Sequence, residues 1–213
     1  FPTRRSSDLK HLMSGVSSML PFVVGGGILI AISFMFGIKA FDPKDAHFNP
    51  FAKFLMDIGG GGAFGYMVPI LAGFIALSIA DRPAFMPGMV AGYMAAQAGG
   101  GFLGGLIGGF LAGYVVVGLK KVFSGLPEVL DGIKPVLLYP LFGLFITGAI
   151  MHFVLVPVVS INDAMKNFLN GMGTGNLVLL GLVLGGMMAV DMGGPVNKAA
   201  FAFGIAMIEA GNN

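Results

Sequence analysis

A long apolar run that ends at a carboxylate constrains the fold of this chain more than any other feature. Residues 176–190 carry no charge, and Asp191 follows them with no polar spacer. Such a run belongs in hydrocarbon or in a buried helix bundle, and a carboxylate placed there is energetically costly. The pattern therefore predicts a membrane helix that meets an acidic group at its end.

A helix-breaking sequence comes directly after this acid. Gly193, Gly194 and Pro195 do not continue a regular helix, because glycine adds backbone freedom and proline has no amide donor. Asn197 and Lys198 close the break before a second apolar helix. Transporters build midplane sites from such charged interruptions, where unwound backbone and half-helix ends meet the ligand. We therefore predict a broken-helix or re-entrant segment here.

This segment has two interpretations. In the simpler one, Asp191 and Lys198 form an ion pair at a membrane interface, and the glycines and proline only make a turn. In the other, Asp191, Asn197 and Lys198 offer acceptors and donors that suit a polyhydroxylated or anionic ligand. Ionisable groups inside membranes mark functional sites more often than structural ones. We favour the ligand site, with the backbone of Gly193 and Gly194 as part of it.

Composition places the whole chain in a membrane. Of its 213 residues, 56% are hydrophobic and only 10% are charged, whereas about a quarter of the residues of a soluble domain are charged. The mean hydropathy is +0.89. The net charge of +2 and the lack of a long basic run exclude a nucleic-acid partner.

The residue types also limit the chemistry. The sequence contains no cysteine, so a thiol nucleophile or a phosphocysteine would have to come from a partner. Its three histidines are far apart and show no metal-ligand spacing. We therefore expect neither a metal site nor a cofactor on this chain.

The order of the apolar segments predicts an all-α polytopic membrane protein with about six transmembrane helices, interfacial helices and the broken-helix segment. Glycine at every fourth position between residues 102 and 119 predicts a face for tight helix packing rather than a site. Amphipathic spacing in residues 51–58 and 161–173 predicts interfacial helices. The expected apolar helices are residues 11–36, 63–80, 85–98, 102–119, 135–160 and 176–190.

A second charged motif, Asp81-Arg82-Pro83, ends one of these helices beside a helix breaker. It is either a plain turn in which the aspartate and the arginine pair with each other, or a ligand-facing turn. We keep Asp81 and Arg82 as candidate substrate-binding residues. Basic residues are more numerous at this end of the helices than at the other end. This asymmetry weakly assigns this end to the cytoplasmic side of the membrane.

The two ends of the sequence differ from the apolar part between them. Residues 1–9 are polar, lack the apolar core of a signal peptide and look like a translated sequencing adapter. We expect residues 1–9 to be a non-native leader, residues 10–207 to be a membrane domain that is incomplete at its C-terminus, and residues 208–213 to be a truncated end.

Four motifs together resemble the fructose-specific IIC component of the bacterial phosphotransferase system. They are HLMSGVSSMLPFVVGGG, SIADRP, LLGLVLGGMMAV and DMGGPVNKAAFAFG, and the similarity covers residues 10–207. The resemblance implies a multi-pass sugar permease of the bacterial cytoplasmic (inner) membrane, dimeric and with about ten helices. It implies that the permease binds fructose or a related sugar, which is phosphorylated during uptake. The phosphoryl donor would be a phosphocysteine of a IIB domain, and a IIA domain would be the second phosphocarrier partner.

The resemblance also implies roles for residues. The chain would be the membrane subunit of a protein-N(pi)-phosphohistidine–fructose phosphotransferase, with Asp191 as its catalytic residue and Asp191 and Asn197 in the sugar site. The family has a later acidic motif of the SEGAIPF kind, before which this sequence ends, so we expect the fragment to be inactive alone. An ion-coupled secondary sugar transporter with Asp191 as the ion site is the alternative, and formation of sugar phosphate distinguishes the two.

Overall fold

The computed structural model describes residues 4–172 and 177–190, and every regular element in these two ranges is a helix. The predicted all-α class is therefore confirmed. The α-helices are α1 (Arg4–Phe34), α2 (Pro50–Met56), α3 (Met67–Ala80), α4 (Arg82–Gln97), α5 (Gly101–Val122), α6 (Tyr139–Met172) and α7 (Leu177–Val190). Two π-helices, η1 (Asp57–Phe64) and η4 (Lys134–Leu138), and two short 3-10 helices, η2 (Phe123–Gly125) and η3 (Glu128–Leu130), complete the set.

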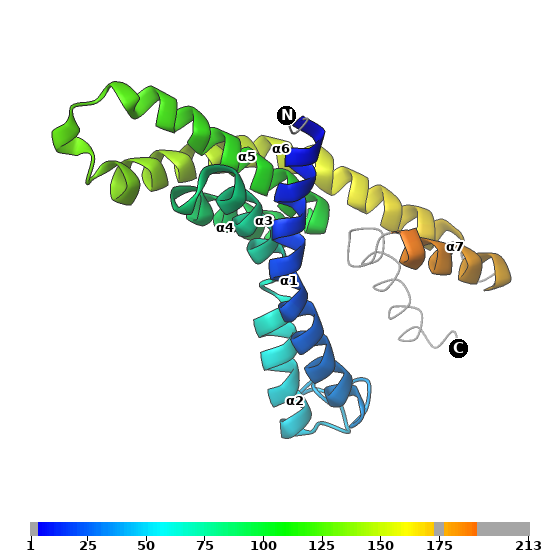
Figure 1. Cartoon of the computed structure of the whole chain (residues 1–213). Helices are drawn as coiled ribbons and strands as arrows, with labels where there is room; N and C mark the ends of the chain where they lie inside the picture. Colours follow the sequence, from blue (N-terminus) through cyan, green and yellow to red (C-terminus); the bar gives the residue numbers. More distant parts are fainter. Residues whose placement is uncertain (1–3, 173–176, 191–213) are drawn as a thin grey trace.

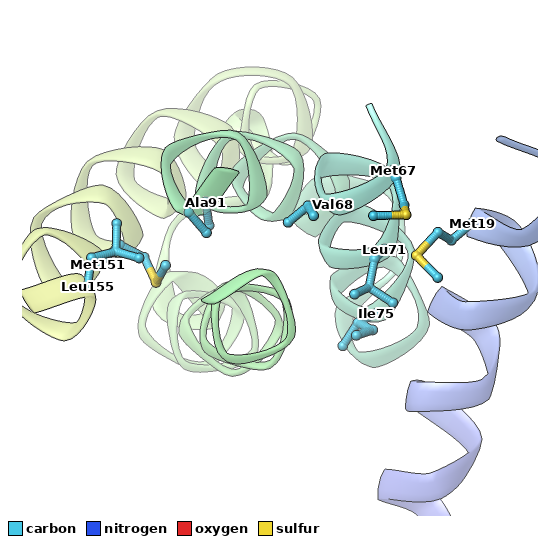
Figure 2. Close-up of a cluster of buried hydrophobic side chains, with 9 residues drawn as sticks. Met19, Met67, Val68, Leu71, Ile75, Ala91, Met151 and Leu155 are labelled. Carbon is cyan, nitrogen blue, oxygen red and sulfur yellow. The ribbon is translucent and has the colours of Figure 1, made fainter. Parts of the chain in front are cut away.

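The centre of the fold is a bundle of α3, α4 and α5, with α1 against α3, and α6 against α4 and α5 (Figure 1). Apolar side chains from α1, α3, α4 and α6 meet in one buried cluster (Figure 2), and partly buried side chains of α5 pack against it. Burial of these side chains and close helix contact hold the bundle together. The cluster consists of Met19, Met67, Val68, Leu71, Ile75, Ala91, Ala95, Met151 and Leu155.

Small residues set the distance between α3 and α5. Gly105, Gly109 and Gly113 are buried on α5, and a Cβ atom built on each of them would lie within 3.0 Å of an α3 atom. The predicted packing role of this glycine face is therefore confirmed, because the two helices approach closely only where α5 lacks side chains.

Four helical segments of the described residues are long and apolar enough to cross a membrane: Asp8–Phe34, Pro50–Ala80, Gly101–Gly125 and Lys134–Ile161. The predicted number of about six spans is not confirmed. The difference comes from α4, with 16 residues, and α7, with 14, because a membrane-spanning helix needs about 20 apolar residues.

The two predicted interfacial helices are parts of longer segments. Residues 51–58 belong to α2 and η1, which lead into α3 within one 31-residue apolar segment. Residues 161–172 continue α6. No glycine or proline occurs between Val158 and Asn170, so nothing in that sequence ends the helix.

The second half of α1 and the antiparallel helix α2 form a hairpin that projects away from the bundle (Figure 1). We call residues 28–58 the arm. Within the arm, Ser33 is fully buried and its hydroxyl donates to the carbonyl oxygen of Ala52 at 2.8 Å. Asn49 caps α2, with its side-chain oxygen accepting from the amide of Phe51 at 2.9 Å. These contacts tie the two helices of the arm together.

Candidate functional site

The main predicted site lies outside the described residues. It consists of five residues that all follow residue 190: Asp191, Gly193, Gly194, Asn197 and Lys198. The structure does describe the apolar helix that precedes these residues. This helix, α7, covers Leu177–Val190, and Asp191 is the next residue in the sequence. The predicted apolar helix is therefore confirmed, and the ligand site stays a prediction.

The second charged motif is described, and it forms a sharp corner between two helices. One residue, Asp81, separates α3 from α4, with φ 60° and ψ −165°. It is the one non-glycine residue with positive φ in the described ranges. This backbone region is essentially restricted to glycine, and strain of this kind costs about 1–3 kcal/mol. Pro83 lies in the first turn of α4, where its missing amide hydrogen leaves no helical bond unmade.

The carboxylate at this corner binds a lysine from α5. Oδ2 of Asp81 lies 2.9 Å from Nζ of Lys120. The pair between Asp81 and Arg82, one of the two interpretations of this turn, is not observed, because the carboxylate turns towards α5 instead. The Asp81 side chain is 84% exposed, so this ion pair adds only about 0–1 kcal/mol to stability.

Arg82 differs from its neighbour. It is exposed, and no ion pair within the described part of the chain involves it. A guanidinium in this position is available to a carboxylate or a phosphate, which it binds through two parallel hydrogen bonds. The corner thus combines a fixed carboxylate–ammonium pair with an open cation.

The corner lies at the end of the bundle where α1 begins. Nδ1 of His11, in the first turns of α1, is 2.8 Å from Oγ of Ser78 near the end of α3. Lys120 brings the end of α5 to the same place. Basic residues from three helices, His11, Arg82 and Lys120, therefore gather at this end.

Besides Ser33 in the arm, two buried polar residues were not singled out from the sequence, and neither lies in a recognisable motif. Lys134, in η4, binds Oδ1 of Asp131 at 2.7 Å and the carbonyl oxygen of Leu126 at 3.2 Å. Thr147, on α6, is 1% exposed, and its hydroxyl has no hydrogen-bond partner. Among the described residues, no group of three histidine, aspartate or glutamate side chains could hold a metal ion.

A groove of about 490 Å³ lies between α1 and η1. Almost all of its surface is apolar, so it does not resemble a sugar site, which needs several converging polar groups. Its lining residues are Pro21, Phe22, Gly25, Gly26, Leu29 and Ala63.

Known proteins similar to this chain carry related names. The chain is 67% identical over 204 residues to the "PTS system fructose-specific EIIABC component" of Bacillus subtilis. The matched region covers 95% of this chain and 32% of that protein. It is 62% identical over 176 residues to the "Fructose permease IIC component" of Bacillus amyloliquefaciens, with 82% and 58% covered. It is 54% identical over 203 residues to the "PTS system fructose-specific EIIB'BC component" of Escherichia coli, with 93% and 35% covered.

The chain spans between about a third and somewhat more than half of the length of these relatives. Their names give no support to an ion-coupled transporter. No solved structure is similar to the chain. A family model described as "Phosphotransferase system, EIIC" matches residues 13–213. Together with the apolar helices, this match makes the chain a membrane protein that belongs to the EIIC family of the phosphotransferase system.

Proposed function

We propose that this chain forms part of a permease that takes up fructose, or a closely related sugar, across the bacterial inner membrane and couples uptake to phosphorylation. The observation that carries the proposal is the 67% identity, over 95% of the chain, to a fructose-specific component. The partners are a IIB domain, the IIA domain that serves it and a second copy of the permease. The B and A letters in the relatives' names support the first two.

The composition of the chain supports this division of labour. The 213 residues contain no cysteine, so a phosphocysteine donor has to lie outside them. In the proposed reaction a sugar hydroxyl attacks the phosphorus, an O–P bond forms, the S–P bond breaks and the cysteine leaves as a thiolate. The attacking hydroxyl needs a base to accept its proton.

Asp191 is the proposed base and a sugar ligand. Its carboxylate accepts hydrogen bonds from sugar hydroxyls and takes the proton from the attacking one. Asn197 and Lys198 complete the polar set, and backbone groups freed at Gly193 and Gly194 add donors and acceptors. A polyhydroxylated ligand matches this mixture of acceptors and donors.

Asp81 and Arg82 have a second proposed role, in substrate binding at the cytoplasmic end. The exposed guanidinium of Arg82 suits the phosphate of the sugar phosphate as it leaves. Asp81, paired with Lys120 at 2.9 Å, lies next to this guanidinium at the same corner.

The test uses the complete gene product in membrane vesicles, supplied with IIB, IIA and the general phosphotransfer proteins. We expect Asp191→Asn to abolish sugar phosphate formation and to leave membrane insertion unchanged. Asp57→Asn is the matched control, because Asp57 is an exposed helical carboxylate in an apolar segment, paired with Lys53 at 2.7 Å. The control should retain phosphorylation.

Two results would oppose the proposal. Normal phosphorylation by the Asp191→Asn protein would remove this carboxylate from the site. Accumulation of free, unphosphorylated sugar that depends on a proton or sodium gradient would instead identify an ion-coupled transporter.

A further inference from the structure

Two helix-weakening segments lie side by side where the arm joins the bundle. In α1, Pro21 is followed by Gly25, Gly26 and Gly27. In η1, glycine occupies residues 59–62. The two segments lie at the same level, because a Cβ atom on Gly26 would lie 2.8 Å from the carbonyl oxygen of Gly59. Proline and consecutive glycines are the usual causes of helix bending, and π-helical turns are often functional.

Close packing does not explain most of these glycines. A Cβ atom on Gly25, Gly27 or Gly61 would meet nothing within 4 Å, and one on Gly62 would make an ordinary 3.5 Å contact. Alanine would therefore fit at all four positions. Since alanine also stabilises helices relative to glycine, the native residues keep these segments flexible without any gain in packing.

One pair of glycines in the same region does need its missing side chains. A Cβ atom on Gly26 would lie 2.8 Å from the carbonyl oxygen of Gly59, and one on Gly59 would lie 2.8 Å from the carbonyl oxygen of Gly26. The two backbones thus touch at one point, and the open glycines lie on either side of it.

The arm and the bundle, which lie on the two sides of this contact, are each held together by their own contacts. In the arm, Ser33 binds Ala52, and the rings of Phe36 and Phe51 meet edge to face at 5.7 Å. Helix α2 packs against α1 and η1, and no extensive packing joins it to α3, α4, α5 or α6. The arm is therefore connected to the bundle through the two glycine-containing segments.

On the other side, the first half of α1 belongs to the bundle. Gly15 lies directly against Leu71 and Ile75 of α3, and His11 binds Ser78. Helix α1 is thus anchored in two different bodies, and Pro21 and the three glycines lie between the anchors.

We propose that the arm swings as a rigid body relative to the bundle about a double hinge, formed by residues 21–27 of α1 and residues 59–62 of η1. The contact between Gly26 and Gly59 is the pivot. The groove provides free space for the bend, because it opens beside residues 21–27 of α1 and faces Ala63, the residue that follows the second hinge segment. This motion is independent of the sugar chemistry proposed above.

The experiment measures the distance between arm and bundle in the complete gene product in vesicles. Spin labels are attached at Ala46→Cys in the arm and Gln97→Cys at the end of α4, two exposed positions. The 213 residues contain no native cysteine to interfere, and any cysteine elsewhere in the gene product is changed to serine. No sugar is added, so the outcome does not depend on the proposed function.

The unaltered protein should give two or more populated distances. One of these distances belongs to the form in which the arm is bent at the hinge. The double variant Gly61→Ala/Gly62→Ala should lower the population of this bent form about tenfold, because each alanine removes backbone freedom. The pair Gly25→Ala with Gly27→Ala should do the same independently. The control is Gly118→Ala in α5, where a Cβ atom also meets nothing within 4 Å.

Three results would overturn the proposal. The first is a single narrow distance in the unaltered protein. The second is that both double-alanine proteins give the same distance distribution as the Gly118→Ala protein. The third is movement of two labels that both lie within the arm, since a rigid arm keeps such distances constant.

Discussion

Replacement of Gly109 by alanine tests whether backbone contact between α3 and α5 holds the bundle together. The added Cβ atom would lie 2.8 Å from the carbonyl oxygen of Ala72, 2.9 Å from its Cα atom and 2.9 Å from Cβ of Ile75. Two of these three atoms belong to the backbone of α3. No change of side-chain rotamer can therefore relieve the clash, and the helices themselves have to move.

The size of the effect follows from these distances. Carbon atoms pack best at about 3.5 Å or more, so α3 and α5 have to separate by roughly 0.6 Å. Overpacking of this kind costs about 1–3 kcal/mol. Alanine also gains up to about 1 kcal/mol of helix propensity over glycine, which partly hides the loss. A leucine at Gly109 adds three more carbon atoms and should prevent assembly of the bundle.

The matched control for this change is Gly118→Ala, in the same helix and without any neighbour within 4 Å of its Cβ position. Both variants gain the same helix propensity, so the difference between them isolates the packing term. Reversible unfolding in mixed micelles should therefore show Gly109→Ala about 1–3 kcal/mol less stable than Gly118→Ala. Equal stability of the two variants would refute the close-contact explanation.

Two further predictions use the same unfolding measurement. Asp81→Gly should raise stability by about 1 kcal/mol, because relief of the strained backbone outweighs loss of the exposed pair with Lys120. Asp81→Asn keeps the strain and loses the pair, so a glycine variant less stable than the asparagine variant would contradict the reasoning. Thr147→Val should be neutral or stabilising by about 1 kcal/mol, because it removes a buried hydroxyl that has no partner. A loss of more than about 1 kcal/mol would mean that this hydroxyl is hydrogen-bonded.

The helical class and the packing face of α5 could be predicted from the sequence because both follow from local patterns. Long apolar runs specify membrane helices, and glycine at every fourth position specifies a flat face. About six spans were predicted and the described residues contain four, because apolar composition alone does not distinguish a short helix such as α4 from a helix that crosses the membrane. Its 16 residues are fewer than the about 20 that a membrane-spanning helix needs.

The corner at Asp81 shows what a local pattern cannot contain. A pair between the adjacent aspartate and arginine was one of the two interpretations of this turn, yet the partner of Asp81 lies 39 residues further along the chain. That partner depends on how α5 packs on α3, which is a property of the assembled bundle. The backbone strain at Asp81 depends on the same assembly, because it arises from the one-residue connection between two packed helices.

The glycines show the same limit in a more general form, because the residue type has two opposite consequences in this fold. At Gly105 and Gly109 the absence of a side chain lets two backbones touch, which favours one rigid arrangement. At Gly61 and Gly62 it leaves open space and an unconstrained backbone, which favours several arrangements. Sequence spacing separates the two only in part, since four consecutive glycines cannot all face one helix. The neighbouring atoms decide the rest: they hold Gly105 and Gly109 in close contact within the bundle and leave Gly61 and Gly62 free at the base of the arm.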